Sequence, residues 1–254
     1  MIDTHAHLDD HKFDCDREQL ISEFEQNNIT FVINNSCDFE GMTNGFELSQ
    51  NHDRIFCTVG MHPYYPEQFN DEFKNFMIEK ASNPKVVAVG EIGLDYHLGG
   101  EDRQAQKDLF ACQLEMADKL GLPVTLHVRD AYQDAVDVLT SCKKYLNNPV
   151  VWHCYSGSAE FAKPFVKQGH YFALGGVITF AHKSDVIRAI PPQQILTETD
   201  CPYMTPLAFR GKRNEPKYIK FVLEKLAKVY DMPYHQLEDV ILQNALRVFS
   251  KIKI

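Results

Sequence analysis

The sequence has no long apolar run and no excess of positive charge. None of its hydrophobic stretches approaches the roughly 18 residues that a membrane-spanning helix needs. The first residues carry acid and histidine where a secretory signal would be basic and then apolar, so we expect a cytoplasmic protein with no membrane partner. The formal net charge of −9 disfavours a broad coating of nucleic acid, but it leaves room for a local basic patch or metal ions to hold a phosphate.

The cysteines lack the spacing of a disulfide framework or a thiolate zinc cluster. Seven are present, an odd number, and no two are arranged as Cys-x-x-Cys. We expect them to be buried small apolar residues. Linkers rich in glycine or serine and low-complexity tracts are also lacking, so residues 1–254 are predicted to form a single domain. Nothing in the pattern requires more than a monomer.

Short runs rich in β-branched residues alternate along the chain with stretches of helical period. Together with the opening segment, the runs at residues 31–36, 55–63, 86–96, 123–129, 150–157, 171–176 and 195–200 predict eight strands. Helices are predicted over residues 101–121, which end in Gly121, and within 231–249, starting at Pro233. This α/β pattern predicts a (β/α)8 TIM barrel, with an open doubly wound sheet as the alternative.

Polar residues stand late in the predicted strands, where the active site of such a barrel gathers. The opening "MIDTHAHLDD" carries His5 and His7 at positions i and i+2, which project from the same side of an extended strand. Six further residues follow the same logic: His62, Glu91, His127, Arg129, His153 and Asp200. A polar group in an apolar strand is costly unless it is hydrogen-bonded or ligated, so the recurrence of such groups predicts a common partner.

Imidazole and carboxylate ligands without thiolate are typical of sites for divalent ions such as Mg²⁺, Mn²⁺ or Zn²⁺. Six ligands exceed what one tetrahedral ion requires, so we predict two ions that share Glu91. The first set of ligands is His5, His7, Glu91 and Asp200. The second set is Glu91, His127 and His153. Two ions about 3.5–4 Å apart are able to stabilise both the attacking and the leaving oxygen of a phosphoryl transfer, which favours hydrolysis.

The ordered motifs of the chain resemble those of the TatD family of metal-dependent deoxyribonucleases, within the amidohydrolase-type barrels. They are "DTHAHLD", "GMHP", "GEIGLDYH", "LHVRDA", "HCYSG", "TETDCPYMTP" and "RGKRNEP", which run from residue 3 to residue 216. The resemblance implies a (β/α)8 barrel, two divalent ions and hydrolysis of DNA, as a 3′–5′ exodeoxyribonuclease on single strands or ends. It also implies catalytic roles for Glu91 and Asp200, with Asp200 as the base that positions the attacking water.

Other residues are predicted to bind the substrate. From its motif, His62 is expected to contact a phosphate rather than to serve as a seventh ligand or a cap. Arg129 shares a strand face with His127 and would reach a phosphate oxygen, with a salt bridge as the alternative. The basic stretch 209–220 follows the last strand, where barrel loops bind phosphate. Its predicted DNA contacts are Arg210, Lys212, Arg213 and Lys217, and a solvated surface is the alternative. Tyr64, Tyr65 and Tyr203 are expected to stack on bases or to pack at the rim.

Two other functions stay open. One is a different hydrolase on the same binuclear site, such as a D-aminoacyl-tRNA deacylase or an enzyme acting on small phosphoesters or amides, because one frame serves many substrates. Many cyclic amide hydrolases of this type bridge their ions with a carboxylated lysine, whereas this chain has Glu91. The other is a scaffold that metal ions only brace, which would not need Arg129 or a basic loop at the mouth.

Overall fold

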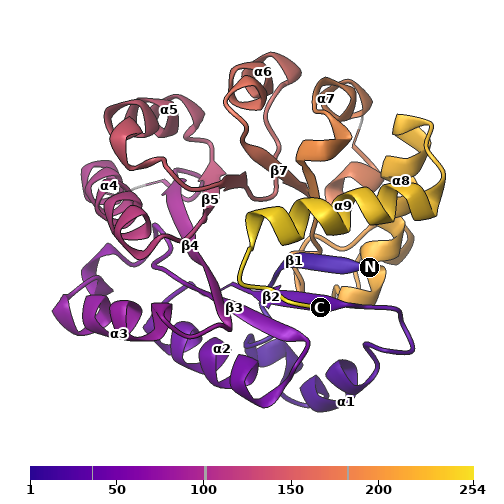
Figure 1. Cartoon of the computed structure of the whole chain (residues 1–254), viewed down its shortest axis with the longest axis horizontal. Coiled ribbons are helices and arrows are strands. Elements are labelled where there is room, and N and C mark those ends of the chain that lie inside the picture. Colours follow the sequence, from indigo (N-terminus) through magenta and orange to yellow (C-terminus); the bar gives the residue numbers. More distant parts are fainter. Residues whose placement is uncertain (36, 100–101, 182) are drawn as a thin grey trace.

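The computed structural model describes residues 1–35, 37–99, 102–181 and 183–254. Its strands form one parallel sheet in the order β1 to β8, and helices surround the sheet (Figure 1). The strands are β1 (Ile2–Ala6), β2 (Phe31–Asn34), β3 (Ile55–Val59), β4 (Val86–Asp95), β5 (Val124–Arg129), β6 (Val150–Trp152), β7 (Tyr171–Leu174) and β8 (Ile195–Thr197). The predicted (β/α)8 barrel is confirmed. Ser36 and Glu101, which belong to predicted elements, lie outside the described residues.

The helices follow the strands in the predicted alternation. They are α1 (Arg17–Ser22), α2 (Phe39–Asn51), α3 (Asp71–Ala81), α4 (Arg103–Leu120), α5 (Tyr132–Ser141), α6 (Ala159–Lys167), α7 (Ser184–Ala189), α8 (Ile219–Tyr230) and α9 (Tyr234–Val248). The Asp102 carboxylate caps α4 by accepting a hydrogen bond from the Ala105 amide at 3.0 Å. At its other end, Gly121 has a φ of +65°, the left-handed conformation that commonly ends a helix. Pro233 directly precedes α9, as predicted.

Most strands end earlier than the sequence predicts, and the difference is largest for β3, β6 and β8. β3 ends at Val59, three residues before His62. After β6 and β8, Cys154 and Asp200 have φ values of +44° and +59°, which an extended strand does not adopt. His62 and Asp200 therefore lie in loops beyond their strands, which is where TIM barrels carry their chemistry.

The barrel closes where β8 meets β1. The Asp200 amide donates to the His5 carbonyl at 2.9 Å, and the His7 amide donates to the Cys201 carbonyl at 2.8 Å. The hydroxyl of Thr197 adds a bond to the Ile2 carbonyl at 3.0 Å. These bonds join the first and last strands, so the opening histidines lie directly beside an aspartate almost 200 positions later in the chain.

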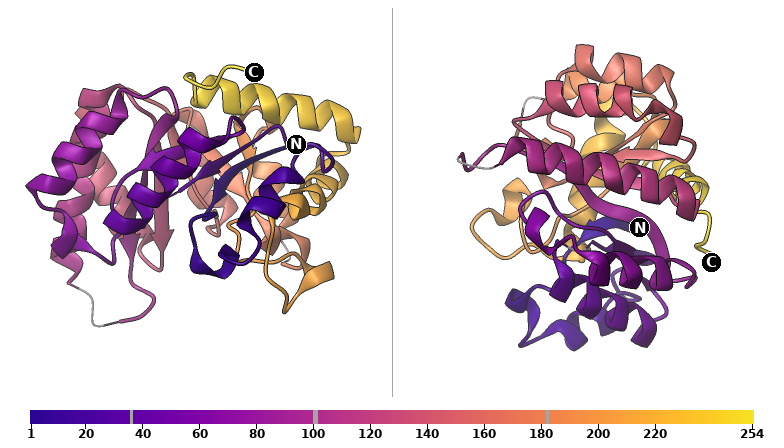
Figure 2. Two further views of the ribbon diagram at one scale, coloured as in Figure 1. Left: turned by 90° about the horizontal axis from the view of Figure 1, so that it is seen from below. Right: turned by 90° about the vertical axis from the view of Figure 1, so that its left-hand side faces the viewer.

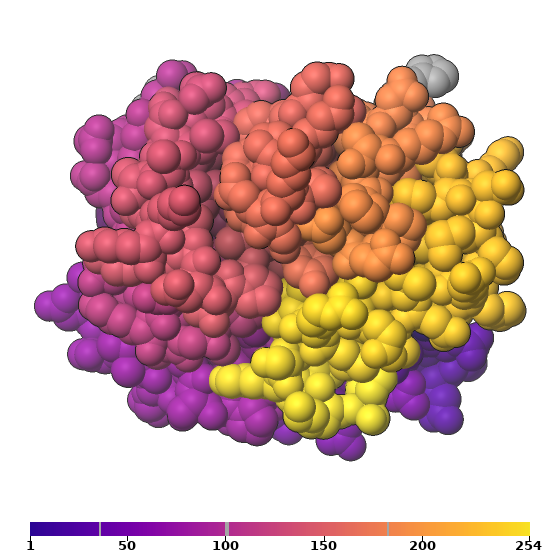
Figure 3. All heavy atoms as spheres, turned by 45° about the horizontal axis from the view of Figure 1, so that its top comes forward, coloured from indigo at the N-terminus to yellow at the C-terminus, as the bar shows by residue number. Residues whose placement is uncertain are grey.

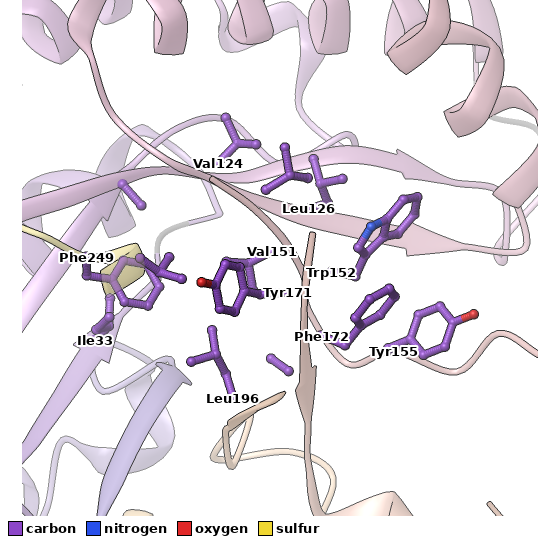
Figure 4. Close-up of a cluster of buried hydrophobic side chains, with 14 of the residues drawn as sticks. Ile33, Val124, Leu126, Val151, Trp152, Tyr155, Tyr171, Phe172, Leu196 and Phe249 are labelled. Carbon is purple, nitrogen blue, oxygen red and sulfur yellow. The ribbon is translucent and has the colours of Figure 1, made fainter. Parts of the chain in front are cut away.

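Side chains alternate between the barrel interior and the layer beneath the helices. Trp152, which is 1% exposed, lies in the outer layer with Phe172 and Tyr155 (Figure 4). Its indole nitrogen donates a hydrogen bond to His170 Nδ1 at 3.0 Å. His153, the next residue, projects to the opposite side. The packing of Trp152 thus fixes the direction in which His153 enters the barrel.

The two ends of the barrel are covered differently. Helix α9 packs against the N-terminal ends of β1 and β8, and Asn244 donates to the Ile195 carbonyl at 2.8 Å. Both termini lie toward that end, while the loop after β8 projects from the other (Figure 2). In the space-filling view, the yellow C-terminal segment lies directly beside the orange and pink segments of the chain (Figure 3). Among the described helices, none is long and apolar enough to cross a lipid bilayer.

Candidate metal centre

The six side chains predicted as metal ligands converge at the C-terminal end of the barrel. His5 lies on β1 and His7 follows that strand, Glu91 lies on β4, and His127 lies on β5. His153 and Asp200 follow β6 and β8. Two triplets of their nitrogen and oxygen atoms lie within 4.8 Å of one another, namely His5, His7 and Asp200, and His5, Glu91 and His153. Among the described residues, His127 forms such a triplet with His62 and Asp95 instead. This spacing suits donors that surround a metal ion.

Glu91 lies between the four histidines and turns one oxygen to each pair. Its Oε2 is 3.4 Å from His5 Nε2 and 3.9 Å from His7 Nε2. Its Oε1 is 2.5 Å from His127 Nδ1 and 3.5 Å from His153 Nε2. These are the pairs of histidines that the sequence assigns to two separate ions. A carboxylate with one oxygen toward each set has the geometry of a bridging ligand.

Asp200 completes the first set. Its Oδ1 lies 3.3 Å from His7 Nε2 and 3.9 Å from the Nε2 atoms of both His5 and His153. Burial would raise the pKa of Asp200, but its bond with His7 and the surrounding histidines lower it below its ordinary value. The carboxylate is therefore ionised at neutral pH.

The state of His5 tests whether these residues fit a metal ion. Its side chain is fully buried, yet neither Nδ1 nor Nε2 has a hydrogen-bond partner among the residues that the structure describes. Burial and the neighbouring His153 lower its pKa, so the ring is neutral and offers a lone pair. Leaving a buried ring nitrogen unbonded is costly. A divalent ion beside Glu91 and Asp200 would remove that cost, so the donor set fits the predicted centre.

The charges of Glu91 and His127 also indicate a site for a cation. Burial would raise the pKa of Glu91, but His127, His5 and His153 hold it well below its usual range. Burial would lower the pKa of His127, but Glu91 and Asp95 raise it to about 9. The carboxylates of Glu91 and Asp95 thus stabilise positive charge at this point of the barrel. A proton on His127 Nδ1 competes for that nitrogen with any ion the site binds.

Three of the four histidines are fixed through the ring nitrogen that faces away from the centre. The contacts are His7 Nδ1 to Asn35 O at 2.8 Å, His127 Nε2 to Asp95 Oδ2 at 2.8 Å and His153 Nδ1 to Glu198 Oε2 at 2.9 Å. Such contacts set the tautomer and orientation of ligating histidines. The sequence analysis did not identify Glu198, although its place in the apolar segment "ILTETD" is the same signal that identified Asp200.

A cavity of about 570 Å³ opens above these residues. Its wall includes His62, Tyr64, Tyr65, Arg129, Tyr203, Cys37 and Cys154, together with the ligand candidates apart from the more deeply buried His5. Tyr203 is 44% exposed and is held at the rim because its hydroxyl donates to Asp10 Oδ2 at 2.7 Å. The cavity therefore joins the candidate ligands to most of the predicted substrate contacts.

His62 lies beside the second set of candidate ligands, with its ring centroid 4.5 Å from that of His127. Its Nδ1 accepts a hydrogen bond from the Tyr64 amide at 3.2 Å, which places its proton on Nε2. Burial and the neighbouring His127 lower its pKa to about 3. His62 is therefore a neutral donor in the cavity wall.

The structure separates the predicted basic residues into two groups. Arg129 lines the cavity. Among the described residues of the cavity wall, Arg210, Lys212 and Arg213 do not appear. Arg213 instead makes two bonds to the Asp16 carboxylate, at 2.7 and 2.6 Å. Arg210 and Lys212 are exposed on the loop after β8. Any contact they make with a substrate therefore lies outside the cavity.

Comparison with known proteins agrees with this arrangement. The family model described as TatD related DNase matches residues 2–250. A metal-dependent hydrolase of Bacillus subtilis (strain 168), YabD, is 34% identical over 252 residues, covering 98% of each chain. The metal-dependent hydrolase TatD of Mycobacterium tuberculosis is 28% identical and also covers 98% of each chain. Both proteins are similar to this chain over its whole barrel.

Solved structures agree as well. YJJV, a TatD homologue from Escherichia coli, superposes with a TM-score of 0.89 at 32% identity, covering 98% of each chain. A TatD family hydrolase from Entamoeba histolytica has a TM-score of 0.89 at 20% identity, covering 99% of this chain and 98% of its own. The second likeness supports the fold alone. With its candidate metal ligands, its barrel and these relatives, the chain belongs to the TatD family of metal-dependent hydrolases.

Proposed function

We propose that this protein is a 3′–5′ exodeoxyribonuclease that acts on single-stranded DNA or on DNA ends, using two divalent ions. The observation that carries the proposal is Glu91, whose two oxygens face two different pairs of histidines. A two-ion site suits phosphoryl transfer because it is able to stabilise charge on both the attacking and leaving oxygens. The family description, TatD related DNase, supports DNA as the substrate.

The residues of the centre divide the work of the reaction. The ions, when bound, supply Lewis-acid activation of a water molecule and neutralise charge on the phosphate. Asp200, ionised and at the floor of the cavity, orients the attacking water and accepts its proton. Glu91 keeps the two ligand sets together. Among Mg²⁺, Mn²⁺ and Zn²⁺, the four histidines favour a transition metal.

The cavity wall supplies contacts for the substrate. Arg129 is placed to bond a phosphate oxygen, and the guanidinium group suits that geometry. His62 offers its Nε2–H as a neutral donor to a second oxygen. Tyr64 and Tyr203 present aromatic surface on which a terminal base is able to stack. Lys212 and Arg210, on the loop after β8, would contact the strand beyond the cavity. We further propose that the protein acts in the cytoplasm as a monomer.

The direct test is cleavage of single-stranded DNA labelled at either end. Metal-stripped protein is supplied with Mg²⁺, Mn²⁺ or Zn²⁺ in turn, and Asp200→Asn serves as the control. We expect a metal to restore cleavage, with the 3′ label lost first. Loss of the 5′ label first would overturn the polarity. No cleavage with any ion, in folded and metal-loaded protein, would overturn the nuclease and direct the search to D-aminoacyl-tRNA and small phosphoesters.

A further inference from the structure

Two cysteines face the metal centre, contrary to the expectation that the thiols only fill the core. Cys37 and Cys154 both line the cavity above the candidate ligands. The Cys154 Sγ lies within 4.8 Å of ligand atoms of both His153 and Asp200. Bonds of about 2.3 Å to sulfur and about 2.0 Å to nitrogen bring two donors of one ion within about 4.3 Å of each other. Small side-chain movements are enough to place the thiol on an ion that His153 and Asp200 also bind.

Cys154 is held in place by the residue that orients His153. Glu198 accepts a hydrogen bond from the Cys154 amide on Oε1 at 2.6 Å, while its Oε2 bonds His153 Nδ1 at 2.9 Å. One fully buried carboxylate therefore orients the His153 ring and fixes the backbone of the neighbouring Cys154. The φ of +44° at Cys154 turns the backbone out of the strand direction at this point. His153 and Cys154 accordingly form a preorganised pair beside Asp200.

A second observation shows that the surrounding cluster is built for an ion. Within the described part of the chain, the fully buried His5 ring has no hydrogen-bond partner, and its Nε2 lies 3.4 Å from Glu91 and 3.9 Å from Asp200. The thiol of Cys154 therefore lies beside a centre whose own donors already require a cation. Hard ions such as Mg²⁺ and Mn²⁺ prefer oxygen, whereas soft ions accept thiolate.

We propose that Cys154 is an additional metal ligand, which binds soft divalent ions such as Cd²⁺ or Zn²⁺ together with His153 and Asp200, one residue from each predicted ligand set. On binding, the sulfur–metal bond forms as the thiol proton passes to solvent, and no electron is transferred. With Mg²⁺ or Mn²⁺ the thiol stays protonated and outside the ligand set. The proposal rests on the metal centre of the proposed function, and it assigns to this chain a ligand that changes with the softness of the ion.

Cys37 provides a matched comparison in the same cavity. Its Sγ is 3.9 Å from His7 Nδ1, and that nitrogen is already bonded to the Asn35 carbonyl at 2.8 Å. The same thiol lies within 4.8 Å of ligand atoms of both His7 and Glu91, but the His7 nitrogen that it contacts is the one already occupied by Asn35. We expect Cys37 to contribute little to metal binding.

The test is a cadmium titration of metal-stripped protein, followed by the ultraviolet charge-transfer absorption of cadmium thiolate. The exposed Cys15 and Cys112 are replaced by serine in every sample to remove their background. We expect Cys154→Ser to abolish the band and to weaken cadmium binding at least about tenfold. Cys37→Ser should keep both. A band that persists in Cys154→Ser, or that is lost in Cys37→Ser, would overturn the proposal.

A second measurement uses the unaltered protein and so does not depend on the folding of a variant. Alkylation of each cysteine is mapped by mass spectrometry with and without Cd²⁺. Selective protection of Cys154 supports the proposal, and equal protection of Cys37 and Cys154, or none, overturns it. Neither measurement uses DNA. A protein that shows the cadmium–thiolate band but does not cleave DNA would contradict the proposed nuclease activity and still support Cys154 as a metal ligand.

Discussion

Glu198 Oε2 lies 2.9 Å from His153 Nδ1 and thereby turns His153 Nε2 toward Glu91, 3.5 Å away. Its other oxygen accepts the Cys154 amide hydrogen at 2.6 Å. Glu198 is 0% exposed, so both its oxygens depend on these partners. A buried carboxylate outside the predicted ligand set therefore determines how one of the predicted ligands enters the centre.

Replacing Glu198 by glutamine tests this role. Glutamine keeps the shape but puts an NH2 donor at one of the two oxygen positions, so it cannot accept at both the position facing His153 and the position facing the Cys154 amide. We expect metal affinity to fall by about 10–100-fold, measured by competition with a chelating dye. Glu160→Gln makes the same charge change at an exposed position of α6 and should leave affinity unchanged. Wild-type affinity in folded Glu198→Gln would contradict the role.

The bridging role of Glu91 predicts that both ions depend on one residue. Glu91→Ala removes the oxygens that face the pairs His5 and His7, and His127 and His153. We expect the purified variant to lose both ions together, as measured by elemental analysis. His62→Ala alters the cavity wall without touching Glu91 and should keep both. Two tightly bound ions in Glu91→Ala would refute the bridge.

Replacing Arg129 is predicted to weaken substrate binding, whereas replacing Arg213 is predicted to lower stability. Arg129 lines the cavity, so Arg129→Ala should spare metal content and raise the KM for DNA about tenfold, the loss of one charge-assisted contact. Arg213 is bonded to Asp16, so Arg213→Ala should lower the free energy of unfolding by about 1 kcal/mol. Steady-state kinetics and urea unfolding of the two variants separate these effects.

A rise in KM for Arg213→Ala that equals the rise for Arg129→Ala would contradict this division. It would show that the loop after β8 contacts the substrate as strongly as the cavity wall does.

The protonation of His170, which lies outside the candidate metal centre, is predicted to lower the stability of the folded protein in acid. Burial lowers its pKa from 6.5 to about 4, and its Nδ1 accepts the hydrogen bond from Trp152 at 3.0 Å. Between those values the unfolded chain binds a proton that the folded protein does not. The free energy of unfolding should therefore fall by about 3 kcal/mol as the pH drops from about 6.5 to about 4.

Urea unfolding followed by the fluorescence of Trp152, the single tryptophan, measures this effect. His170→Gln removes the titrating group, so its stability should fall less than that of the wild type across the same interval. Parallel curves for the two proteins would show that His170 does not contribute to the acid sensitivity.

The fold and the convergence of the candidate ligands could be predicted because, in a barrel, the order of the strands in the sequence determines which strands are neighbours. His5 and Asp200 are far apart in the chain, yet His5 lies near the end of β1 and Asp200 lies shortly after β8, and these two strands are neighbours once the barrel closes. The pairing of Arg213 with Asp16 has no such rule, because it joins two loops whose meeting depends on the whole fold. The partner of His7 is likewise a backbone carbonyl, that of Asn35, which a sequence pattern does not mark.

The most direct test of the central claim is single-turnover cleavage of a 3′-labelled DNA strand by Asp200→Asn, compared with wild-type protein at equal metal loading. Asparagine keeps the shape and one oxygen but cannot accept the proton of the attacking water at neutral pH. We predict a fall in the cleavage rate of at least about a thousandfold, with DNA binding changed by only a few fold. A metal-loaded Asp200→Asn protein that cleaves at close to the wild-type rate would contradict the account.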